Sequence, residues 1–311
     1  MSPDTSALPP DVSGTALTVG TFDGVHRGHH DVLARLTARA AARGLRSLLV
    51  TFDSHPLEIV NPSAAPPLLT PGAEKLEALA DSGLDYVAIL PFTPALAALD
   101  AERFVVDVLL ARFRMRELLI GHDHGFGRDR AGDAAVLQSL GGRLGFAVEV
   151  VPAVESAEGR SVSSTAIRRA VAGGDLDRAR LALGRPYSAT GTVVTGDGRG
   201  RDLGFRTLNV ALPSRRKLLP PEGVYAVAVQ TPDGPFGGML NLGPRPTFGD
   251  ASLSMEAHLF DADGDWYGAS VRVDFVSRLR ATVRFPSPEA LVAQLGRDEM
   301  AAREALARRG R

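Results

Sequence analysis

The stretch from Val19 to His30, VGTFDGVHRGHH, leads from an apolar run through glycines into a histidine-rich segment. Three of the seven histidines in the chain fall here, at positions 26, 29 and 30. A strand is expected to end near Gly20 and a helix to begin near His29. In parallel sheets, ligands bind where a loop joins the end of a strand to the next helix. The stretch therefore predicts a parallel α/β sheet and the place of its site.

The rest of the first half repeats this alternation of strand and helix. Short runs that are apolar at nearly every position predict strands covered on both faces. They span residues 16–20, 47–52, 86–92, 117–121 and 146–154. Helical patterns lie between them, and the first places Val32, Leu33, Leu36 and Ala40 on one face and ends at Gly44. Three further helices are expected to begin at capping residues, namely Asp100, Ser164 and Asp175. Alternation of this kind predicts a doubly wound α/β domain.

After Gly184 the pattern changes to antiparallel β structure. Residues 223–243 indicate two strands around a Pro-Asp-Gly turn, and residues 254–276 indicate a second pair. The sequence DADGD within that second pair is interpreted as a hairpin turn, because a calcium loop would need a glutamate at its twelfth position. The turn spacing predicts a small barrel, followed by a helix that starts at Ser287. We place the boundary near residue 185, which gives an α/β domain of residues 1–184 and a β-barrel domain of residues 185–311.

Composition excludes several classes of protein. The formal net charge is −1, which provides no general attraction to nucleic acid or to an anionic membrane. Cysteine is absent, so disulfides, thiolate zinc sites and cysteine nucleophiles are excluded. No secretory signal or membrane-spanning run is apparent. We expect a cytoplasmic protein without nucleic-acid or membrane partners, whose oligomeric state the sequence leaves open.

The opening stretch contains an H-x-G-H pattern with a specific chemistry. Backbone N–H groups at a helix start bind anions, and Gly24 and Gly28 let a phosphate approach the backbone. His26 and His29 add donors that can meet the charge developing during phosphate transfer. The pattern suits nucleotidyl transfer; the alternative is a glycine-containing turn with incidental histidines. His30 is expected to be solvated.

The ordered set of motifs resembles the prokaryotic bifunctional riboflavin kinase/FAD synthetase family. GTFDGVHRGHH is similar to its first signature, and the resemblance continues through TFDSHPLEIV, EKLEALADSGLDYVAILPF, IGHDHGFG, SVSSTAIRRAV and LGRPYSATGTVVTGDGRGRDLGFRTLN. It ends with GVYAV, NLGPRPTFG, MEAHLFD and the C-terminal helix, so it covers nearly the whole chain. The resemblance implies a nucleotidyltransferase-like α/β domain followed by a riboflavin kinase barrel.

For the first half, the resemblance implies that ATP adenylylates FMN to give FAD and pyrophosphate. The FMN phosphate has a second pKa of about 6, so it is mostly dianionic at neutral pH and needs no general base. The resemblance implies catalytic roles for His26, His29 and Arg168. It also implies contacts with ATP and its phosphates at Gly20, Phe22, Asp23, Gly24, Gly28, Asp123, Ser163, Ser164 and Thr165. For residues 163–168 the alternative is that the hydroxyl groups only cap a helix and that Arg168 is solvated.

Four other positions of the first half matter to the resemblance. Asp53 and His55 either line the flavin side or only shape the turn before Pro56. Ala166 stands where family members usually carry an arginine, and His124 stands where an aromatic residue is more usual.

Phosphorylation of riboflavin differs because the ribityl hydroxyl is neutral and must lose a proton as it attacks. A carboxylate base is therefore expected. The resemblance implies Glu256, whose strand pattern places Ser254 and His258 on the same face; the alternative is an exposed strand glutamate. A flexible glycine loop would hold the ATP phosphates through Gly196, Gly198, Arg199 and Gly200.

Thr207 and Asn209 are the expected magnesium ligands, because they offer hard oxygen atoms two residues apart on one side of an extended segment. Arg206 departs from the family pattern P-T-A-N, so the fixed φ of its proline is missing. The resemblance also places Arg280 near the flavin. The basic run of residues 215–217, which includes Lys217, is expected to be solvated.

ATP and magnesium are thus the expected cofactors, and riboflavin, FMN and FAD are the other expected ligands. An alternative is an FMN adenylyltransferase whose second domain only binds flavin, which Arg206 motivates. A third alternative is an H-x-G-H transferase for another phosphorylated acceptor, but it leaves the second half unexplained.

Overall fold

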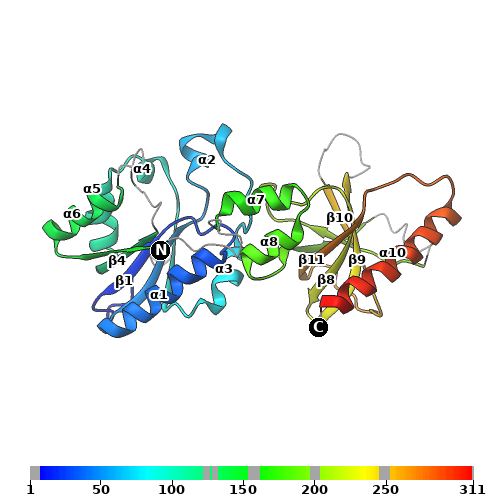
Figure 1. Ribbon diagram of the computed structural model, residues 1–311, viewed down its shortest axis with the longest axis horizontal. Coiled ribbons are helices and arrows are strands. Elements are labelled where there is room, and N and C mark those ends of the chain that lie inside the picture. Colours follow the sequence, from blue (N-terminus) through cyan, green and yellow to red (C-terminus); the bar gives the residue numbers. More distant parts are fainter. Residues whose placement is uncertain are drawn as a thin grey trace. The chain divides into compact units, whose positions relative to one another are not determined.

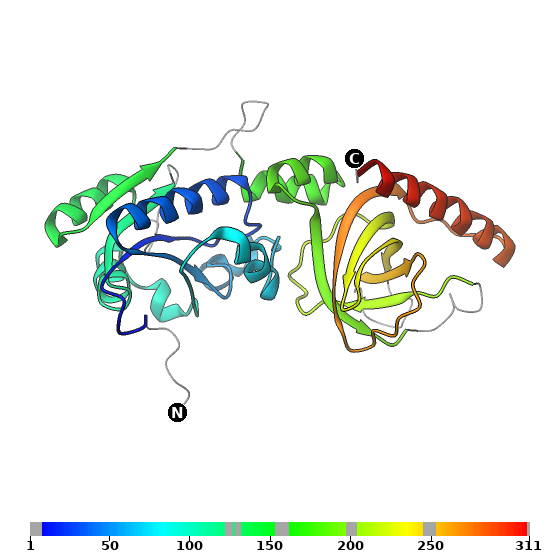
Figure 2. The same ribbon diagram turned by 90° about the horizontal axis from the view of Figure 1, so that it is seen from below.

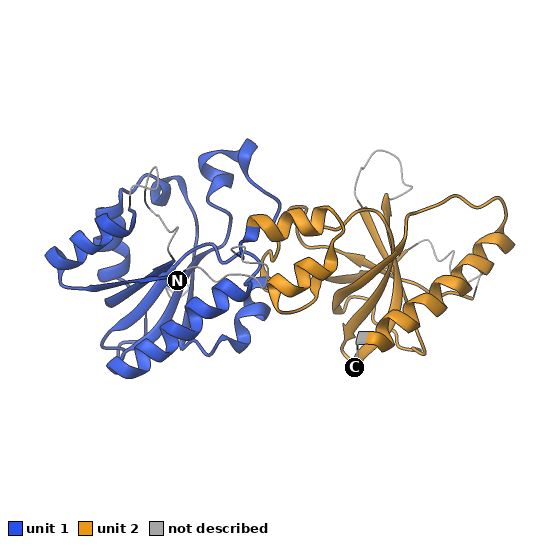
Figure 3. Ribbon diagram, viewed as in Figure 1, with its two compact units in different colours: residues 1–68, 75–164 blue, residues 69–74, 165–311 orange. Residues whose placement is uncertain are grey.

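The computed structural model describes residues 8–121, 127, 132–152, 162–196, 204–244 and 253–309. The chain divides into two compact units, residues 1–68 with 75–164 and residues 69–74 with 165–311 (Figure 3). This division falls after Ser164, whereas the sequence places the boundary at 184/185. The helices between those two positions therefore group with the barrel, and the limit of each functional domain stays a prediction.

The first unit is built on a parallel sheet (Figure 1), whose five strands have the order β3-β2-β1-β4-β5. The strands are β1 (Thr15–Val19), β2 (Arg46–Phe52), β3 (Tyr86–Leu90), β4 (Met115–Gly121) and β5 (Ala147–Val151). All four pairings are parallel. The expected doubly wound α/β architecture is confirmed.

Short and long helices connect these strands. They are α1 (Arg27–Arg43), α2 (Leu57–Val60), η1 (Pro62–Ala64), α3 (Ala73–Leu79), η2 (Ala80–Ser82), α4 (Pro94–Ala97), α5 (Ala101–Arg103), the π-helix η3 (Phe104–Leu110) and α6 (Ala134–Leu144). As the sequence predicts, α1 ends at Gly44, which has a left-handed φ of 63°. The Asp100 carboxylate accepts a hydrogen bond from the N–H of Arg103 at 2.7 Å and caps α5.

Both faces of the sheet are buried. Successive residues of one strand enter different cores, so that on β4 Leu118 packs into one core and Leu119 into the other. The first core contains Phe104 of η3, and the second contains Leu33 and Leu36 of α1. This two-sided burial explains why the strands are apolar at nearly every position.

The second unit contains a closed barrel (Figure 2), whose strands have the order β10-β7-β6-β11-β8-β9. Its elements are α7 (Ser164–Ala172), α8 (Leu176–Leu183), β6 (Tyr187–Val194), β7 (Leu208–Ala211), β8 (Gly223–Thr231), β9 (Gly234–Pro244), β10 (Leu253–Leu259), β11 (Ser270–Arg280) and α10 (Pro288–Arg309).

The C-terminal helix α10 begins as the sequence predicts and covers part of the barrel. The Ser287 hydroxyl accepts a hydrogen bond from the N–H of Ala290 at 3.3 Å and caps the helix. Ala302 and Leu306 of α10 pack on Ala226 of β8 and Met239 of β9. The helix therefore shares a small apolar core with two strands of the barrel.

The segment from residue 254 to 276 does not form the hairpin that its turn sequence predicts. β10 pairs with β7 and β9, whereas β11 pairs with β6 and β8. DADGD therefore begins a connection between strands that are not neighbours. The prediction was wrong because closure of the barrel gives each strand two partners, and both places beside β10 and β11 are taken by other strands.

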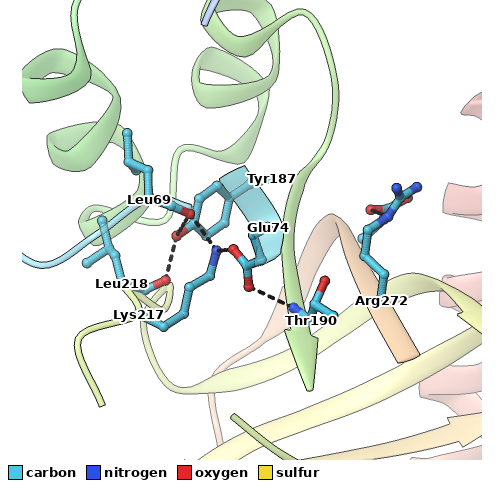
Figure 4. Close-up of polar contacts among 8 residues, drawn as sticks. Leu69, Glu74, Tyr187, Thr190, Lys217, Leu218 and Arg272 are labelled. Atoms are coloured by element: carbon cyan, nitrogen blue, oxygen red, sulfur yellow. Dashed lines mark hydrogen bonds and ion pairs between the residues drawn. The ribbon is translucent and has the colours of Figure 1, made fainter. Parts of the chain in front are cut away.

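A buried ion pair holds residues 69–74 within the second unit (Figure 4). The Lys217 ammonium donates to the Glu74 carboxylate at 2.5 Å and to the carbonyl oxygen of Leu69 at 2.6 Å. The other carboxylate oxygen of Glu74 accepts from the backbone N–H of Thr190 at 2.8 Å. The Lys217 and Glu74 side chains are only 1% and 5% exposed. The prediction of a solvated Lys217 was wrong because its partner lies 143 positions away in the sequence.

In the described part of the chain, no helix combines the length and apolar composition that a membrane crossing requires.

We predict that Lys217→Met destabilises the barrel unit by about 3–5 kcal/mol, because it leaves the Glu74 carboxylate buried without its counter-charge. Urea unfolding followed by Trp266 fluorescence measures this, since the only tryptophan of the chain is buried in the barrel. Adding Glu74→Gln to the variant should recover part of the loss. Arg284→Met, at an exposed position of the second unit, is the control and should change stability by no more than about 0.5 kcal/mol. A Lys217→Met protein as stable as the wild type would contradict the prediction.

Candidate active sites

The first site begins at the loop between β1 and α1. Phe22, Gly24 and Val25 have positive φ angles of 46°, 89° and 39°. This region is unfavourable for bulky and branched residues. Phe22 and Val25 are nevertheless buried, at 5% and 0% exposure, in the core that contains Leu33 and Leu36. Their burial holds the loop in a conformation that local preference alone would not select.

This loop places His26 at the N-cap of α1. The Nδ1 atom of His26 accepts a hydrogen bond from the backbone N–H of His29 at 3.2 Å. The two rings stack with centroids 3.7 Å apart and planes 14° from parallel. Because Nδ1 of His26 is an acceptor, a neutral ring carries its proton on Nε2, which is then a donor. The helix begins at Arg27, two residues earlier than expected, so both histidines lie at its first turn.

Gly28 leaves room for this arrangement. A Cβ at position 28 would lie 3.2 Å from two ring atoms of His26 and 3.6 Å from the carbonyl oxygen of Val162. Gly20 is similarly confined, because a Cβ there would lie 3.0 Å from the ring of Phe22. The glycines therefore permit close packing of rings and backbone around the loop.

A segment from far along the chain reaches the same loop. The Ser164 hydroxyl donates to the carbonyl oxygen of Asp23 at 2.8 Å. Asp23 is itself 2% exposed, and the neighbouring carbonyl of Val162 faces Gly28. Residues 162–164 thus meet the loop before α1, although Asp23 and Ser164 are 141 positions apart.

For the remaining predicted ATP-binding residues and Arg168, the structure gives at most their position and burial. Ser163 is half-buried just before α7, whereas Thr165 is exposed and Arg168 is half-buried on that helix. Asp123 lies outside the described residues. The roles of all four stay predictions.

Asp53 and His55 follow β2 at the same edge of the sheet as the loop after β1. Asp53 accepts a hydrogen bond from the N–H of Phe92 at 3.1 Å. The Nδ1 atom of His55 accepts from the N–H of Leu57 at 3.2 Å, which shapes the turn into α2. The turn role that the sequence allows for His55 is therefore present, and a flavin contact for either residue stays a prediction.

The second site is centred on Glu256 in the barrel. In the strand register Glu256 lies opposite Asn209 of β7 on one side and Asn241 of β9 on the other. Side chains directly opposite each other on neighbouring strands point to the same face. The Ser254 hydroxyl donates to the Glu256 carboxylate at 3.4 Å. Glu256 is half-buried, so this carboxylate is neither a core group nor a fully exposed strand residue.

The segment before β7 is held against this face. A Cβ on Gly196 would lie 1.9 Å from the Asn209 amide nitrogen, so the backbone of the glycine loop passes directly against that side chain. The ring nitrogen Nδ1 of His258 lies 2.8 Å from the carbonyl oxygen of Arg206. His258 also contacts the ring of Phe205, with centroids 5.1 Å apart. These contacts fix the residues that lead into Thr207.

The donors at this face suit a metal ion that is shared with a phosphate ligand. Among the described residues, no three His, Cys, Asp or Glu side chains are grouped as a metal site. Thr207 and Asn209 offer a hydroxyl and an amide oxygen, and Glu256 lies opposite Asn209. Magnesium commonly binds through few protein oxygens together with substrate phosphates and water. The residues present therefore fit magnesium.

The other predicted residues of the second half either make contacts elsewhere or lie outside the described residues. Arg280 forms an ion pair with Asp298 of α10, with its Nη2 atom 2.6 Å from a carboxylate oxygen. This contact ties β11 to α10, and the predicted flavin contact is not tested by it. Gly198, Arg199 and Gly200 lie outside the described residues.

Asn241 lies opposite Glu256, and sequence reasoning did not identify this neighbour. It lies in the motif NLGPRPTFG, but nothing in that motif indicates the strand register that sets it opposite Glu256. The contact between His258 and the Arg206 carbonyl is a second such feature. Strand alternation places His258 on the same face as Glu256, so the sequence carries a signal for its position but not for its partner.

Comparison with known proteins also divides the chain into an N-terminal and a C-terminal part. A family model described as FAD synthetase matches residues 8–166, and one described as riboflavin kinase matches residues 183–306. The curated bifunctional riboflavin kinase/FMN adenylyltransferase of Escherichia coli K12 is 41% identical over 293 residues, covering 94% of this chain and 92% of the relative. The protein of the same name from Pseudomonas fluorescens is 41% identical over 297 residues, covering 95% and 94%.

A solved structure supports the fold. The crystal structure of a protein named macrolide-efflux protein from Streptococcus pneumoniae matches with a TM-score of 0.85 and 30% identity, covering 96% of this chain and 95% of that one. Its name differs from those of the curated relatives, while both family models and those relatives agree on flavin chemistry.

The cap formed by His26 can be separated from any chemical role of its ring. We predict that His26→Ala destabilises the first unit by about 0.5–2 kcal/mol, because the N–H of His29 loses its acceptor. His26→Asn should recover most of this loss, since asparagine is a favourable N-cap residue. Thermal and urea unfolding monitored by circular dichroism measures both effects. Equal stability of the alanine variant and the wild type would show that the cap contributes nothing.

Proposed function

The chain belongs to the family of bifunctional riboflavin kinases/FMN adenylyltransferases, and from this premise we propose which residues serve each reaction. The enzyme phosphorylates riboflavin to FMN in its C-terminal riboflavin kinase part and adenylylates FMN to FAD in its N-terminal FAD synthetase part. The assignment of residues rests on one observation. Each unit contains a different polar arrangement, and each arrangement suits only one of the two reactions. The first has stacked imidazoles at a helix start, and the second has a carboxylate between two amides.

The adenylyl transfer uses the loop after β1. A phosphate oxygen of FMN attacks the α-phosphorus of ATP, the bond to the β-phosphate breaks, and pyrophosphate leaves. The attacking group is already charged, so the protein has to align two anions and relieve their repulsion. His26 and His29 donate to the phosphates beside the N–H groups of α1. In this proposal Ser163, Ser164, Thr165 and Arg168 hold the departing pyrophosphate, and the contact between Ser164 and Asp23 supports the role of Ser164.

The kinase reaction uses the carboxylate of the barrel. Glu256 accepts the proton of the ribityl hydroxyl, whose oxygen then attacks the γ-phosphorus of ATP while ADP leaves. The register sets this half-buried carboxylate between Asn209 and Asn241, whose amide groups can orient it toward the hydroxyl. Gly196, Gly198, Arg199 and Gly200 line the phosphates of ATP in this proposal.

Magnesium is proposed at Thr207 and Asn209. When bound, it would neutralise charge on the transferring phosphoryl group. The chain itself holds the two ligands in place through the packing of Gly196 on Asn209 and the contact of His258 with the carbonyl of Arg206. That second contact restrains the segment in which Arg206 replaces the family proline. The replacement therefore gives no reason to reduce the barrel to a flavin-binding domain.

ATP is a substrate of both reactions, riboflavin and FMN are the acceptors, and FAD is the final product. The cytoplasmic location and the lack of nucleic-acid and membrane partners stay predictions. The oligomeric state stays open.

Two substitutions should separate the reactions. His29→Ala should slow FAD formation by about 10²–10³-fold, the effect of losing one transition-state donor, and should leave FMN formation unchanged. Glu256→Gln should slow FMN formation and leave adenylylation of added FMN unchanged. Chromatography of the flavins formed from riboflavin, or from FMN, with ATP and magnesium measures both rates. If either substitution removes both activities from a folded protein, the assignment fails.

Gly196→Ala should slow FMN formation at least about tenfold, because the added Cβ would displace the amide of Asn209. The variant should need a higher magnesium concentration than the wild type to reach its half-maximal rate of FMN formation. FAD formation from FMN should stay unchanged. Gly296→Ala is the control, because a Cβ at that position in α10 meets nothing within 4 Å. Normal magnesium dependence in Gly196→Ala would argue against Asn209 as a ligand.

A further inference from the structure

Lys75 lies at the edge of the parallel sheet where β1 and β2 end, although none of the steps above uses it. Its ammonium donates to the carbonyl oxygen of Phe52 at 2.8 Å and lies 3.4 Å from the Thr51 hydroxyl. These two residues end β2. The Thr51 hydroxyl in turn donates to the carbonyl oxygen of Thr21 at 3.2 Å. Lys75 therefore lies where the end of β2 meets the loop that precedes His26.

The choice of lysine at this position is informative. The chain has 33 arginines and only two lysines, Lys75 and Lys217. Lys217 is a structural residue whose ammonium is enclosed by a carboxylate, a carbonyl group and the ring of Tyr187. Among the described residues, the two acceptors of Lys75 are neutral oxygen atoms, and no carboxylate there accepts a hydrogen bond from its ammonium. A compact ammonium on a flexible stem suits an anion that arrives and leaves.

The surroundings of Lys75 explain why a cation is needed there. Burial lowers the pKa of Lys75 from its usual value, and the nearby carboxylates of Asp23 and Asp53 act in the opposite direction. These two carboxylates would repel the dianionic phosphate of FMN at this edge of the sheet. The positive charge of Lys75 near these carboxylates would offset that repulsion.

We propose that Lys75 binds the phosphate group of FMN during adenylyl transfer. This rests on the function proposed above for the first unit. The assignment to FMN follows from position, because Lys75 is bound to the end of β2, and Asp53 and His55 of the predicted flavin side follow directly. The phosphates of ATP are assigned instead to the start of α1 and to residues 163–165.

The test compares three variants in FAD formation from FMN and ATP. Lys75→Met removes the charge, Lys75→Gln also keeps a donor for the carbonyl of Phe52, and Lys75→Arg keeps the charge. The first two should raise the KM for FMN by about 10–100-fold, the effect of losing one charge-assisted hydrogen bond, with the KM for ATP within about twofold of the wild type. Lys75→Arg should recover part of the loss. The kcat/KM for FMN should also fall less steeply with added salt in the two uncharged variants.

Other outcomes overturn the proposal. A raised KM for ATP alone would assign Lys75 to the nucleotide phosphates. A lower melting temperature with both KM values and the salt dependence unchanged would make it a structural residue, and a loss confined to kcat would indicate action through Asp23 or Asp53. FMN formation from riboflavin is the internal control and should remain within about twofold of the wild type. Failure of the wild type itself to form FAD would instead refute the function of the first unit.

Discussion

The first site depends on the backbone conformation of residues 22–25. A residue other than glycine in the left-handed region costs on the order of 1–3 kcal/mol, and this loop contains two, Phe22 and Val25. Burying each of these side chains contributes about 1.5–3 kcal/mol, which is enough to offset that cost. The core beneath α1 therefore stabilises the loop that places His26 and His29 at the helix start. A site built in this way is held in position before any ligand binds.

The second site depends on a different constraint, the register of a closed barrel. Glu256 lies between Asn209 and Asn241 because β10 has a neighbour on each side. The same closure separates β10 from β11 and removes the hairpin expected around DADGD. Every strand of the barrel needs two partners. This requirement accounts both for the neighbours of Glu256 and for the wrong prediction of a hairpin between β10 and β11.

The two lysines show how one residue type serves opposite purposes in the two units. Lys217 is enclosed with Glu74, so its charge contributes to holding residues 69–74 in the second unit. Lys75, the next residue after Glu74, instead bonds to neutral oxygens at the end of β2 in the first unit. The difference is set by the partners that the fold supplies and not by the local sequence, in which a glutamate and a lysine simply follow one another.

The sequence by itself determined the α/β and β halves, the end of one helix at Gly44 and the start of another at Asp100. These features depend on local periodicity, on capping and on the chemistry of side chains within a few positions. Only the tertiary structure decided that Ser164 meets Asp23, that Glu256 lies opposite Asn241, and that Lys217 is buried with Glu74. Each of these contacts joins residues that are distant along the chain or set by strand register. Local patterns carry no information about such pairings, because they are fixed by how whole elements pack.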